Sequence, residues 1–500
     1  MLESTVPIFD ESGYNELSRR CLRDFPGRGL TLEVVAMNNS IAISRRALLA
    51  RSGCGFGLLA LADLLAADEP DRTAHPYAVR PPHHTPKARR IIFLYMPGGP
   101  SHVDLLDPKP RLAMDNGKPL PFDKPKLERT KTGNLLASPW KFAKHGQSGI
   151  EVSELLPGLA SRIDDVCVIR SMYADNINHT GAALQMCTGE QAFSRPSMGS
   201  WLTYGLGTVN QNLPGFVVVS PAAVFQGAQL WASSFLPSAY QGTLVRDLKN
   251  PVANLGDSTG SLDHQRLKLD ALRKLNEIHK RDRVIESQLD ARIASFELAF
   301  RMQREAPEAF DLTRESEAVQ KLYGTDKPAT ELFGRQCLLA RRLVERGVRF
   351  VQLFDAPANN AWDQHGGLRE NLPKRCQAVD QPITALLTDL KARGMLDDTL
   401  VLWGGEFGRT PTAEGDNGRE HHPFGFTMWM AGGGVRGGMT YGATDEFGWH
   451  SVQNKVHVHD LHATILHLMG LNHERLTYRH GGRDYRLTDV FGNVVHEIIA

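Results

Sequence analysis

Short apolar runs alternate with amphipathic stretches along most of the chain after residue 89. Residues 90–96 form one continuous apolar run, which is typical of a strand buried on both faces of a parallel sheet. Other short runs predict further strands, and stretches with apolar residues three or four apart predict helices that end near a glycine. We expect strands at 166–170, 217–219, 348–354, 399–403 and 426–431, and helices at 333–346, 382–393 and 460–469.

This alternation predicts an α/β domain over residues 89–500, with a mainly parallel central sheet sandwiched by helices. Residues 262–305 break the rhythm, because their leucines, isoleucines and phenylalanines recur three or four apart amid charged residues. That spacing predicts a helical insertion that packs on the sheet. In open α/β sheets, ligands bind at the carboxyl ends of the strands, so the candidate chemistry is sought there.

The first 69 residues form an N-terminal extension with the features of an export signal. Arg45 and Arg46 precede the apolar stretch 55–61, and small residues follow at Ala66 and Ala67. This order is that of a cleaved signal peptide, and the arginine pair resembles a twin-arginine signal. We therefore expect export by the twin-arginine machinery and a periplasmic or secreted protein. A true start at Met37 would give a signal of ordinary length, and residues 70–88 are expected to form a linker.

The overall charge gives no reason to expect a nucleic-acid or anionic-membrane partner, because 57 basic and 56 acidic residues leave a net charge of +1. No apolar run reaches the roughly 18 residues of a membrane-spanning helix, so no stable span is expected. The six cysteines contain no C-x-x-C pair, which favours free thiols over a disulfide framework or a zinc ribbon.

Clusters of histidine and carboxylate residues follow several of the predicted strands. Imidazoles and carboxylates that lie at strand ends are typical ligands of a divalent metal ion in a hydrolytic enzyme. A site with two such ions can hold both the attacking and the leaving oxygen of the reaction. We expect divalent ions here, two in number, with zinc, manganese, magnesium and calcium all open. The candidate ligands are His102, Asp104, Asp363, His365, Glu406, His421, His422, His459 and His462. The competing interpretations are solvated loop charges, salt bridges to Arg409 or Arg419, and core histidines.

Residues that would act on a substrate are expected around His179 and Thr180, at the start of a helix. Free backbone N–H groups at a helix N-terminus stabilise an anion, so Thr180 is a candidate nucleophile, with a helix N-cap as the alternative. Arg409 or Arg195 could hold an anionic group by bidentate hydrogen bonds.

Six segments together resemble a known family. They are 96–104 (MPGGPSHVD), 178–181 (NHTG), 362–365 (WDQH), 404–411 (GGEFGRTP), 418–423 (GREHHP) and 457–468 (HVHDLHATILHL). Over residues 85–500 the chain is similar to the exported sulfatase-like proteins of domain-of-unknown-function family 1501. That family is placed in the alkaline-phosphatase-like superfamily of phosphatases, sulfatases and phosphomutases. The resemblance implies a sheet sandwiched by helices, with two metal ions at the strand ends.

The superfamily pattern carries over unevenly to this sequence. Its late-strand Asp-His pair corresponds to Glu406-Phe407, where phenylalanine cannot bind metal, so an imidazole from His421 or His422 is implied instead. The other implied ligands are Asp104 (with His102 as a rival), Asp363, His365, and His459 or His462. No C/S-x-P-x-R string of formylglycine sulfatases occurs.

The sequence therefore predicts an exported metal-dependent hydrolase of phosphate or sulfate esters, sulfatase-like but without the formylglycine motif. Its substrate is expected to be a small-molecule or glycan ester. Two alternatives stay open: a non-catalytic metal- or ligand-binding protein on the same fold, and a metal-dependent transferase or mutase.

Overall fold

A nine-stranded mixed sheet runs through the part of the chain that the structure, a computed structural model, describes: residues 76–123, 132–248, 262–281, 287–357 and 361–500. The strand order is β12 (Met439–Tyr441), β4 (Val166–Tyr173), β11 (Phe426–Ala431), β8 (Thr399–Gly404), β1 (Arg90–Tyr95), β7 (Phe350–Phe354), β5 (Phe216–Val219) and β6 (Thr243–Val245), with β15 (Val456–His457) also beside β4. β11 runs antiparallel to both of its neighbours, and all other neighbours in this sheet are parallel. The predicted mainly parallel α/β sheet is confirmed.

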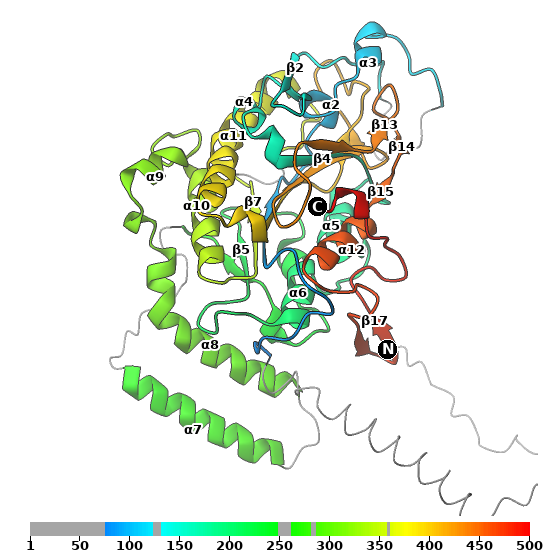
Figure 1. Cartoon of the computed structure of the whole chain (residues 1–500). Coiled ribbons are helices and arrows are strands. Elements are labelled where there is room, and N and C mark those ends of the chain that lie inside the picture. Colours follow the sequence, from blue (N-terminus) through cyan, green and yellow to red (C-terminus); the bar gives the residue numbers. More distant parts are fainter. Residues whose placement is uncertain (1–75, 124–131, 249–261, 282–286, 358–360) are drawn as a thin grey trace, which may run out of the picture. The chain divides into compact units, whose positions relative to one another are not determined.

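Both faces of the central strands are buried under helices, as the continuous apolar run of β1 predicts. Alternate residues of β1 belong to two different core clusters: Ile92 and Leu94 lie in one, and Ile91 and Phe93 in the other. The first cluster includes residues of α10 (Glu331–Glu345) and α11 (Leu368–Ala392); the second includes residues of α5 (His179–Thr188), α6 (Met198–Leu206) and α12 (Val458–Leu468). Figure 1 shows these helices around the sheet.

Helix α11 is much longer than the predicted helix 382–393, because it begins at Leu368 and continues through Pro373 and Pro382. A proline inside a helix costs about 3 kcal/mol or more. Packing outweighs that cost, since residues three or four apart along the whole helix are buried against the sheet. They are Leu372, Cys376, Val379, Ile383, Leu386 and Leu390.

The predicted helical insertion is present as α7 (Leu262–Arg281) and α8 (Ser287–Phe310). Residues of α8 contact α7 on one side and α10 on the other, so α8 joins the insertion to the helices of the sheet. No described helix combines the length and apolar character needed to cross a membrane.

Several shorter helices and two-stranded sheets lie outside the main sheet and its covering helices. The helices are α2 (His102–Leu105), α3 (Pro110–Met114), α4 (Pro157–Ala160) and α9 (Glu317–Leu322). The paired strands are β2 (Phe142–His145) with β3 (Ile150–Ser153), β9 (Gly408–Arg409) with β10 (His421–His422), β13 (Ala443–Thr444) with β14 (Ser451–Gln453), and β16 (Tyr478–His480) with β17 (Arg483–Tyr485).

The segment before β1, expected to be a linker, is described from residue 76 and is hydrogen-bonded to the domain. The buried Arg80 guanidinium donates to the Tyr204 carbonyl over 2.9 Å, and the His83 N–H donates to the Gly470 carbonyl over 2.8 Å. The twin-arginine segment and Met37 lie outside the described residues.

Candidate metal centre

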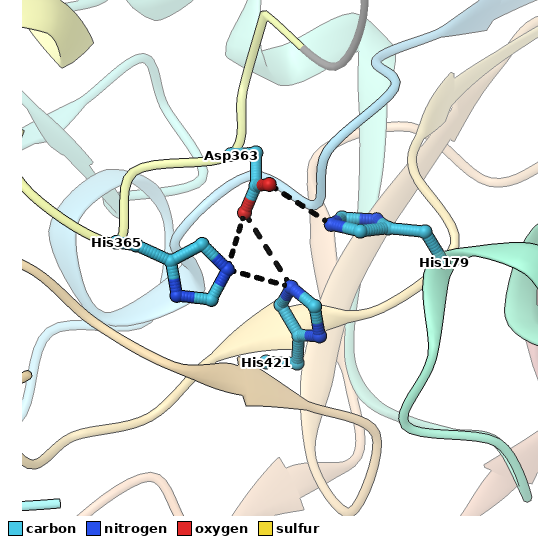
Figure 2. Close-up of side chains that lie close together, drawn as sticks. All are labelled: His179, Asp363, His365 and His421. Carbon is cyan, nitrogen blue, oxygen red and sulfur yellow. Dashed lines mark hydrogen bonds and ion pairs between the residues drawn. The ribbon is translucent and has the colours of Figure 1, made fainter. Parts of the chain in front are cut away.

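Four side chains from three separate segments converge beyond the carboxyl ends of the parallel strands. His179 opens α5 after β4, Asp363 and His365 lie in the segment between β7 and α11, and His421 lies in β10. One donor atom from each lies within 4.8 Å of one donor atom from every other. Figure 2 shows all four pointing toward a common centre. Because β4, β8, β1 and β7 run in the same direction, the segments that follow them meet at one edge of the sheet.

The distances within this cluster suit a shared cation. The His365 Nε2 atom lies 3.0 Å from Asp363 Oδ1 and 3.0 Å from His421 Nε2, and His421 Nε2 lies 3.4 Å from the same carboxylate oxygen. His179 Nε2 is 3.2 Å from Asp363 Oδ2 but makes no hydrogen bond to a described residue. Four ligands at bond lengths of about 2.0–2.1 Å around a tetrahedral zinc ion would lie about 3.3 Å apart. His365 Nε2, His421 Nε2 and Asp363 Oδ1 are spaced close to this distance, and His179 Nε2 approaches the other oxygen of the same carboxylate.

The other ring nitrogen of each histidine faces an oxygen acceptor. Nδ1 of His179 lies 2.6 Å from Glu406 Oε1, Nδ1 of His365 lies 2.5 Å from Glu414 Oε2, and Nδ1 of His421 lies 2.9 Å from the Ile177 carbonyl. An acceptor at Nδ1 places the proton there, so that the lone pair at Nε2 points toward the centre. Metal-binding histidines almost always have a partner of this kind, which fixes the tautomer and the ring orientation.

The electrostatics favour an ionised Asp363 carboxylate and attract positive charge to two of the three imidazoles beside it. Burial by itself would raise the pKa of Asp363, but the three histidines and the Arg409 guanidinium hold it well below its usual range. Burial lowers the pKa of His421. Burial also opposes the charged form of His179, but the carboxylates of Asp363 and Glu406 raise its pKa above the ordinary value, and Asp363 raises that of His365. A cation would replace the protons that these two histidines otherwise attract.

Gly98 allows the strand-end segments to meet at this edge. A Cβ atom on Gly98 would lie 2.4 Å from the Asp363 amide nitrogen, and the backbone φ of +116° is one that residues with side chains rarely adopt. The Gly98 N–H donates to Glu406 Oε1 over 2.9 Å, and the Trp362 N–H donates to the Pro97 carbonyl over 3.0 Å. The segment after β1 thus anchors both Glu406 and the backbone next to Asp363.

The cluster is closed on one side and open on the other. The His421 side chain is 1% exposed, whereas Asp363 is 21% exposed and His365 is 25% exposed. Structural zinc sites are closed, and catalytic sites keep one position open to water or substrate. The exposure of Asp363 and His365 therefore resembles the open kind.

Arg409 supports this centre from the buried side. Its guanidinium is fully buried and lies 2.6 Å from Asp363 Oδ1, and it also donates to the carbonyls of Gly98, Gly99 and Arg419. The Arg409 guanidinium, which the sequence suggested as a binding group for a substrate anion, is thus already bound to four partners within the protein. The other suggested cation, Arg195, lies 2.8 Å from the Glu190 carboxylate.

Thr180 is the second helical residue of α5, and its side chain is exposed next to His179. The alternative interpretation of Thr180 as the helix N-cap is wrong. Asn178 is the N-cap, and its Oδ1 accepts from the Thr180 N–H over 2.9 Å. The Thr180 side chain is exposed to solvent, directly after His179 in the chain.

Asp104, the candidate carboxylate after β1, is not among the converging donors. Its carboxylate accepts from Arg419 Nε over 2.7 Å and from Arg419 Nη2 over 3.0 Å, and both side chains are fully buried. This bidentate ion pair compensates the buried charge without a metal ion.

The remaining histidine candidates are also placed away from the converging donors. The rings of His102 and His422 stack with their centroids 6.0 Å apart, and their Nε2 atoms lie 2.8 Å and 2.5 Å from the carbonyls of Gly448 and Trp449. His459 and His462 lie on α12, where their Nε2 atoms face the carbonyls of Gly189 and Met186 at 2.9 Å and 2.8 Å.

Glu414 is a part of the site that sequence reasoning missed. It lies between β9 and β10, six residues before Glu420, in a segment that contains Gly415 and Gly418. Those glycines indicate a turn that could have returned Glu414 toward His421. Glu414, the buried Glu420 and His365 also form a second group of donors that shares His365 with the first.

Comparison with protein families gives one decisive match. The model of a family described as "Protein of unknown function (DUF1501)" matches residues 88–499. The chain belongs to this family. The family resemblance inferred from the six sequence segments is thereby confirmed. A search of curated proteins gave no match.

Solved structures similar to this chain include a synthase, a sulfatase and a phosphatase. The lipoteichoic acid synthase LtaP from Listeria monocytogenes has a TM-score of 0.34 and 11% identity, covering 80% of this chain and 77% of its own. The PsFucS1 sulfatase from Pseudoalteromonas sp. has a TM-score of 0.33 and 13% sequence identity, and the match covers 77% of this chain and 68% of the sulfatase. An alkaline phosphatase from the Antarctic bacterium TAB5 has a TM-score of 0.33 and 10% sequence identity, and the match covers 78% of this chain and 99% of the phosphatase. These TM-scores are too low to transfer a site or an activity, so the function must be sought in this chain's own residues.

Proposed function

We propose that His179, Asp363, His365 and His421 bind one divalent transition-metal ion and that the protein is a metal-dependent hydrolase of phosphate or sulfate esters. The observation that carries the metal site is the shared orientation of the three imidazoles. Each Nδ1 faces an oxygen, and each Nε2 faces the centre where Asp363 lies. Imidazole nitrogens with one carboxylate favour zinc or a similar transition metal over calcium or magnesium, which prefer oxygen ligands.

The side chains around this centre have distinct roles in the proposed hydrolase. A divalent ion supplies Lewis acidity toward an ester oxygen and lowers the pKa of water. Glu406 and Glu414 hold the rings of His179 and His365 in place, and Arg409 holds the Asp363 carboxylate. The exposed side of Asp363 and His365 is where an ester and water would enter.

The attacking nucleophile in the proposed hydrolysis has two candidates, the Thr180 hydroxyl and a water molecule. Thr180 is exposed and directly follows His179 in the chain. Thr180→Ala should leave metal content and most of the turnover intact if water attacks. If Thr180 attacks, Thr180→Ala should abolish turnover, and Thr180→Ser should retain much of it.

The proposal is tested by metal analysis and by turnover on a panel of esters. Purified protein should retain about one equivalent of metal per chain after dialysis, and it should hydrolyse at least one aryl phosphate, phosphodiester or aryl sulfate in a metal-dependent way. Absence of tight metal binding would overturn the metal site. Bound metal without turnover of any ester would instead support the non-catalytic binding protein, and group transfer to an added alcohol would support a transferase.

We further infer that the protein is exported by the twin-arginine route, on the strength of Arg45, Arg46 and the apolar stretch that follows them. Replacing both arginines by lysine should keep the protein in the cytoplasm, because that machinery reads the arginine pair. Fractionation of cells that produce the two forms is the measurement. Normal export of the double variant would contradict the inference.

A further inference from the structure

Helix α7 has two apolar faces, and α8 partly covers one of them. Leu269 and Leu272 of α7 line a groove of about 220 Å³ together with Ile293 and Phe296 of α8. Figure 1 shows α7 lying alongside α8. The second face contains Leu267, Ala271, Leu275 and Ile278, which lie on one side of the helix because they are three or four residues apart.

The second face, here called the outer stripe (Leu267, Ala271, Leu275 and Ile278), is exposed. Leu267 is 65% exposed, Leu275 is 62% exposed and Ile278 is 57% exposed. Single exposed leucines are ordinary on protein surfaces, but an aligned row of them indicates an interaction site. At a rise of 1.5 Å per residue, the stripe extends over about 17 Å of helix.

The outer stripe is flanked by positive charge. Lys268 and Lys274 lie on either side of it, both are exposed, and neither makes an ion pair with a described residue. The negative charge of Asp270 is taken up on the other face, where its carboxylate lies 3.0 Å from Arg266 and 4.0 Å from Arg273. Over its whole length the α7 sequence has six Lys or Arg and three Asp or Glu residues, a net charge of +3.

This charge distribution decides between two kinds of partner. If two copies of α7 packed stripe to stripe, the lysines of one copy would approach those of the other and repel them. An anionic lipid surface complements the same lysines, because their ammonium groups can reach the headgroups while leucine and isoleucine enter the acyl boundary. A polar helix with one apolar stripe and flanking lysines is the pattern of a helix that lies in a membrane interface.

We propose that α7 docks the protein on the surface of an anionic lipid bilayer through its outer stripe, with Lys268 and Lys274 at the headgroups. The docking is peripheral, since α7 is too polar to cross a membrane. It is independent of the metal centre. The near-zero charge of the whole chain does not oppose it, because screening limits electrostatic attraction to charges within about 10 Å of the surface.

The test uses the full chain with an environment-sensitive fluorophore on a cysteine introduced by Leu275→Cys. Cys21 and Cys54 are changed to serine, and the four described cysteines are buried, with burial raising the pKa of Cys167 and of Cys187 to about 12, so they should not react. The label should shift to the blue on phosphatidylglycerol-containing vesicles and much less on pure phosphatidylcholine. A label introduced by Leu322→Cys on α9, which is 40% exposed, is the matched control and should not shift.

The lysines are tested in the same labelled protein. Lysines near an anionic surface are attracted to it, so Lys268→Glu with Lys274→Glu should weaken vesicle binding by about 30-fold or more. Lys321→Glu with Lys327→Glu near α9 is the matched charge control and should leave binding unchanged. Circular dichroism melting curves verify that each variant is folded.

Three outcomes would overturn the proposal. The first is a label at position 275 that does not respond to anionic vesicles. The second is vesicle binding that is equal in the Lys268→Glu, Lys274→Glu variant and its control. The third is a response at position 275 that depends on protein concentration without any vesicles and coincides with a dimer in sedimentation equilibrium. That last result would show that the outer stripe joins two copies of the chain.

Discussion

Two groups of histidines in this protein look alike in sequence and differ in structure. His179, His365 and His421 come from three distant segments, whereas His459 and His462 lie one turn apart on α12. In the first group each Nδ1 faces an acceptor oxygen and the Nε2 atoms face one another around Asp363. In the second group each Nε2 faces a backbone carbonyl, and Nδ1 is buried without a hydrogen bond to a described residue.

In both groups one ring nitrogen faces an oxygen, so the groups differ in what the other ring nitrogen faces: further donor atoms in the first group, and no hydrogen-bond partner among the described residues in the second. A hydrogen bond from Nδ1 to Glu406, Glu414 or the Ile177 carbonyl leaves the Nε2 lone pair pointing into a shared space that also holds a carboxylate. His462 instead faces Met186 O, among apolar groups of α12 and α5, and burial lowers its pKa to about 3. The first group can therefore gain a cation, and the second is stable as neutral imidazole.

The largest expected effect is loss of metal when one converging donor is removed. Asp363→Ala should weaken metal binding by more than about 100-fold, beyond the roughly 10- to 100-fold that follows loss of an outer partner. His459→Gln, in the other group, should keep the full metal content. Metal analysis after dialysis and calorimetric titration with zinc measure both. Equal metal loss in the two variants would abolish the distinction between the groups.

The second expected effect is a pH dependence of stability that comes from His462. Its pKa in the folded protein, about 3, is lower than the ordinary 6.5, so the unfolded chain binds more protons between these values. The stability is fully present above pH 6.5 and falls as the pH drops toward 3, by up to about 1.4 kcal/mol per pH unit.

Urea unfolding of the wild type and of His462→Gln between pH 7 and pH 4 measures this contribution. The amide can still donate to the Met186 carbonyl but does not titrate, so the variant should lose less stability on acidification. His459, which lies near His462, is present in both proteins. Parallel curves for the two proteins would show that His462 is not held neutral.

The third expected effect concerns the carboxylates behind the ligands. Glu414→Gln and Glu406→Gln should each weaken metal affinity by roughly 10- to 100-fold, because a neutral amide orients the imidazole less firmly than a carboxylate does. Full occupancy should still be reached at high metal concentration. Glu370→Gln, at an exposed carboxylate that accepts from Asn417, is the control and should bind like the wild type. Unchanged metal affinity in both Glu414→Gln and Glu406→Gln would show that these carboxylates do not support metal binding through the Nδ1 atoms.

The smallest expected effect separates Asn178 from Thr180 at the start of α5. Asn178→Ala should lower the free energy of unfolding by about 1 kcal/mol, because the side chain caps the helix that carries His179. Thr180→Ala should change it by less than about 0.5 kcal/mol, since its side chain is exposed. Denaturant unfolding at pH 7 measures both values. A greater loss for Thr180→Ala would show a structural role that the contacts of Thr180 do not reveal.

Local sequence was sufficient for the six inner strands of the sheet, but not for β6, β12 and β15, and it was sufficient for part of the site. The run 90–96 predicted β1, and the prediction 426–431 coincides with β11, because a strand buried on both faces is apolar at nearly every position. The pair Asp363 and His365 was also predicted, since both follow a strand that ends at the ligand-binding edge.

Tertiary structure alone decided which of the many candidate ligands meet. Asp104 and Asp363 each follow a parallel strand. Asp104 forms a bidentate ion pair with the buried Arg419, whereas Asp363 contacts the buried Arg409 and lies among three imidazoles. Glu414 lies in the turn between the paired strands β9 and β10; Gly415 and Gly418 indicate that turn, but they do not show which histidine the carboxylate meets. The sequence determines which donors exist and near which strand end they lie. Only the folded backbone determines which ring nitrogen faces which oxygen, because that choice depends on contacts between residues far apart in the chain.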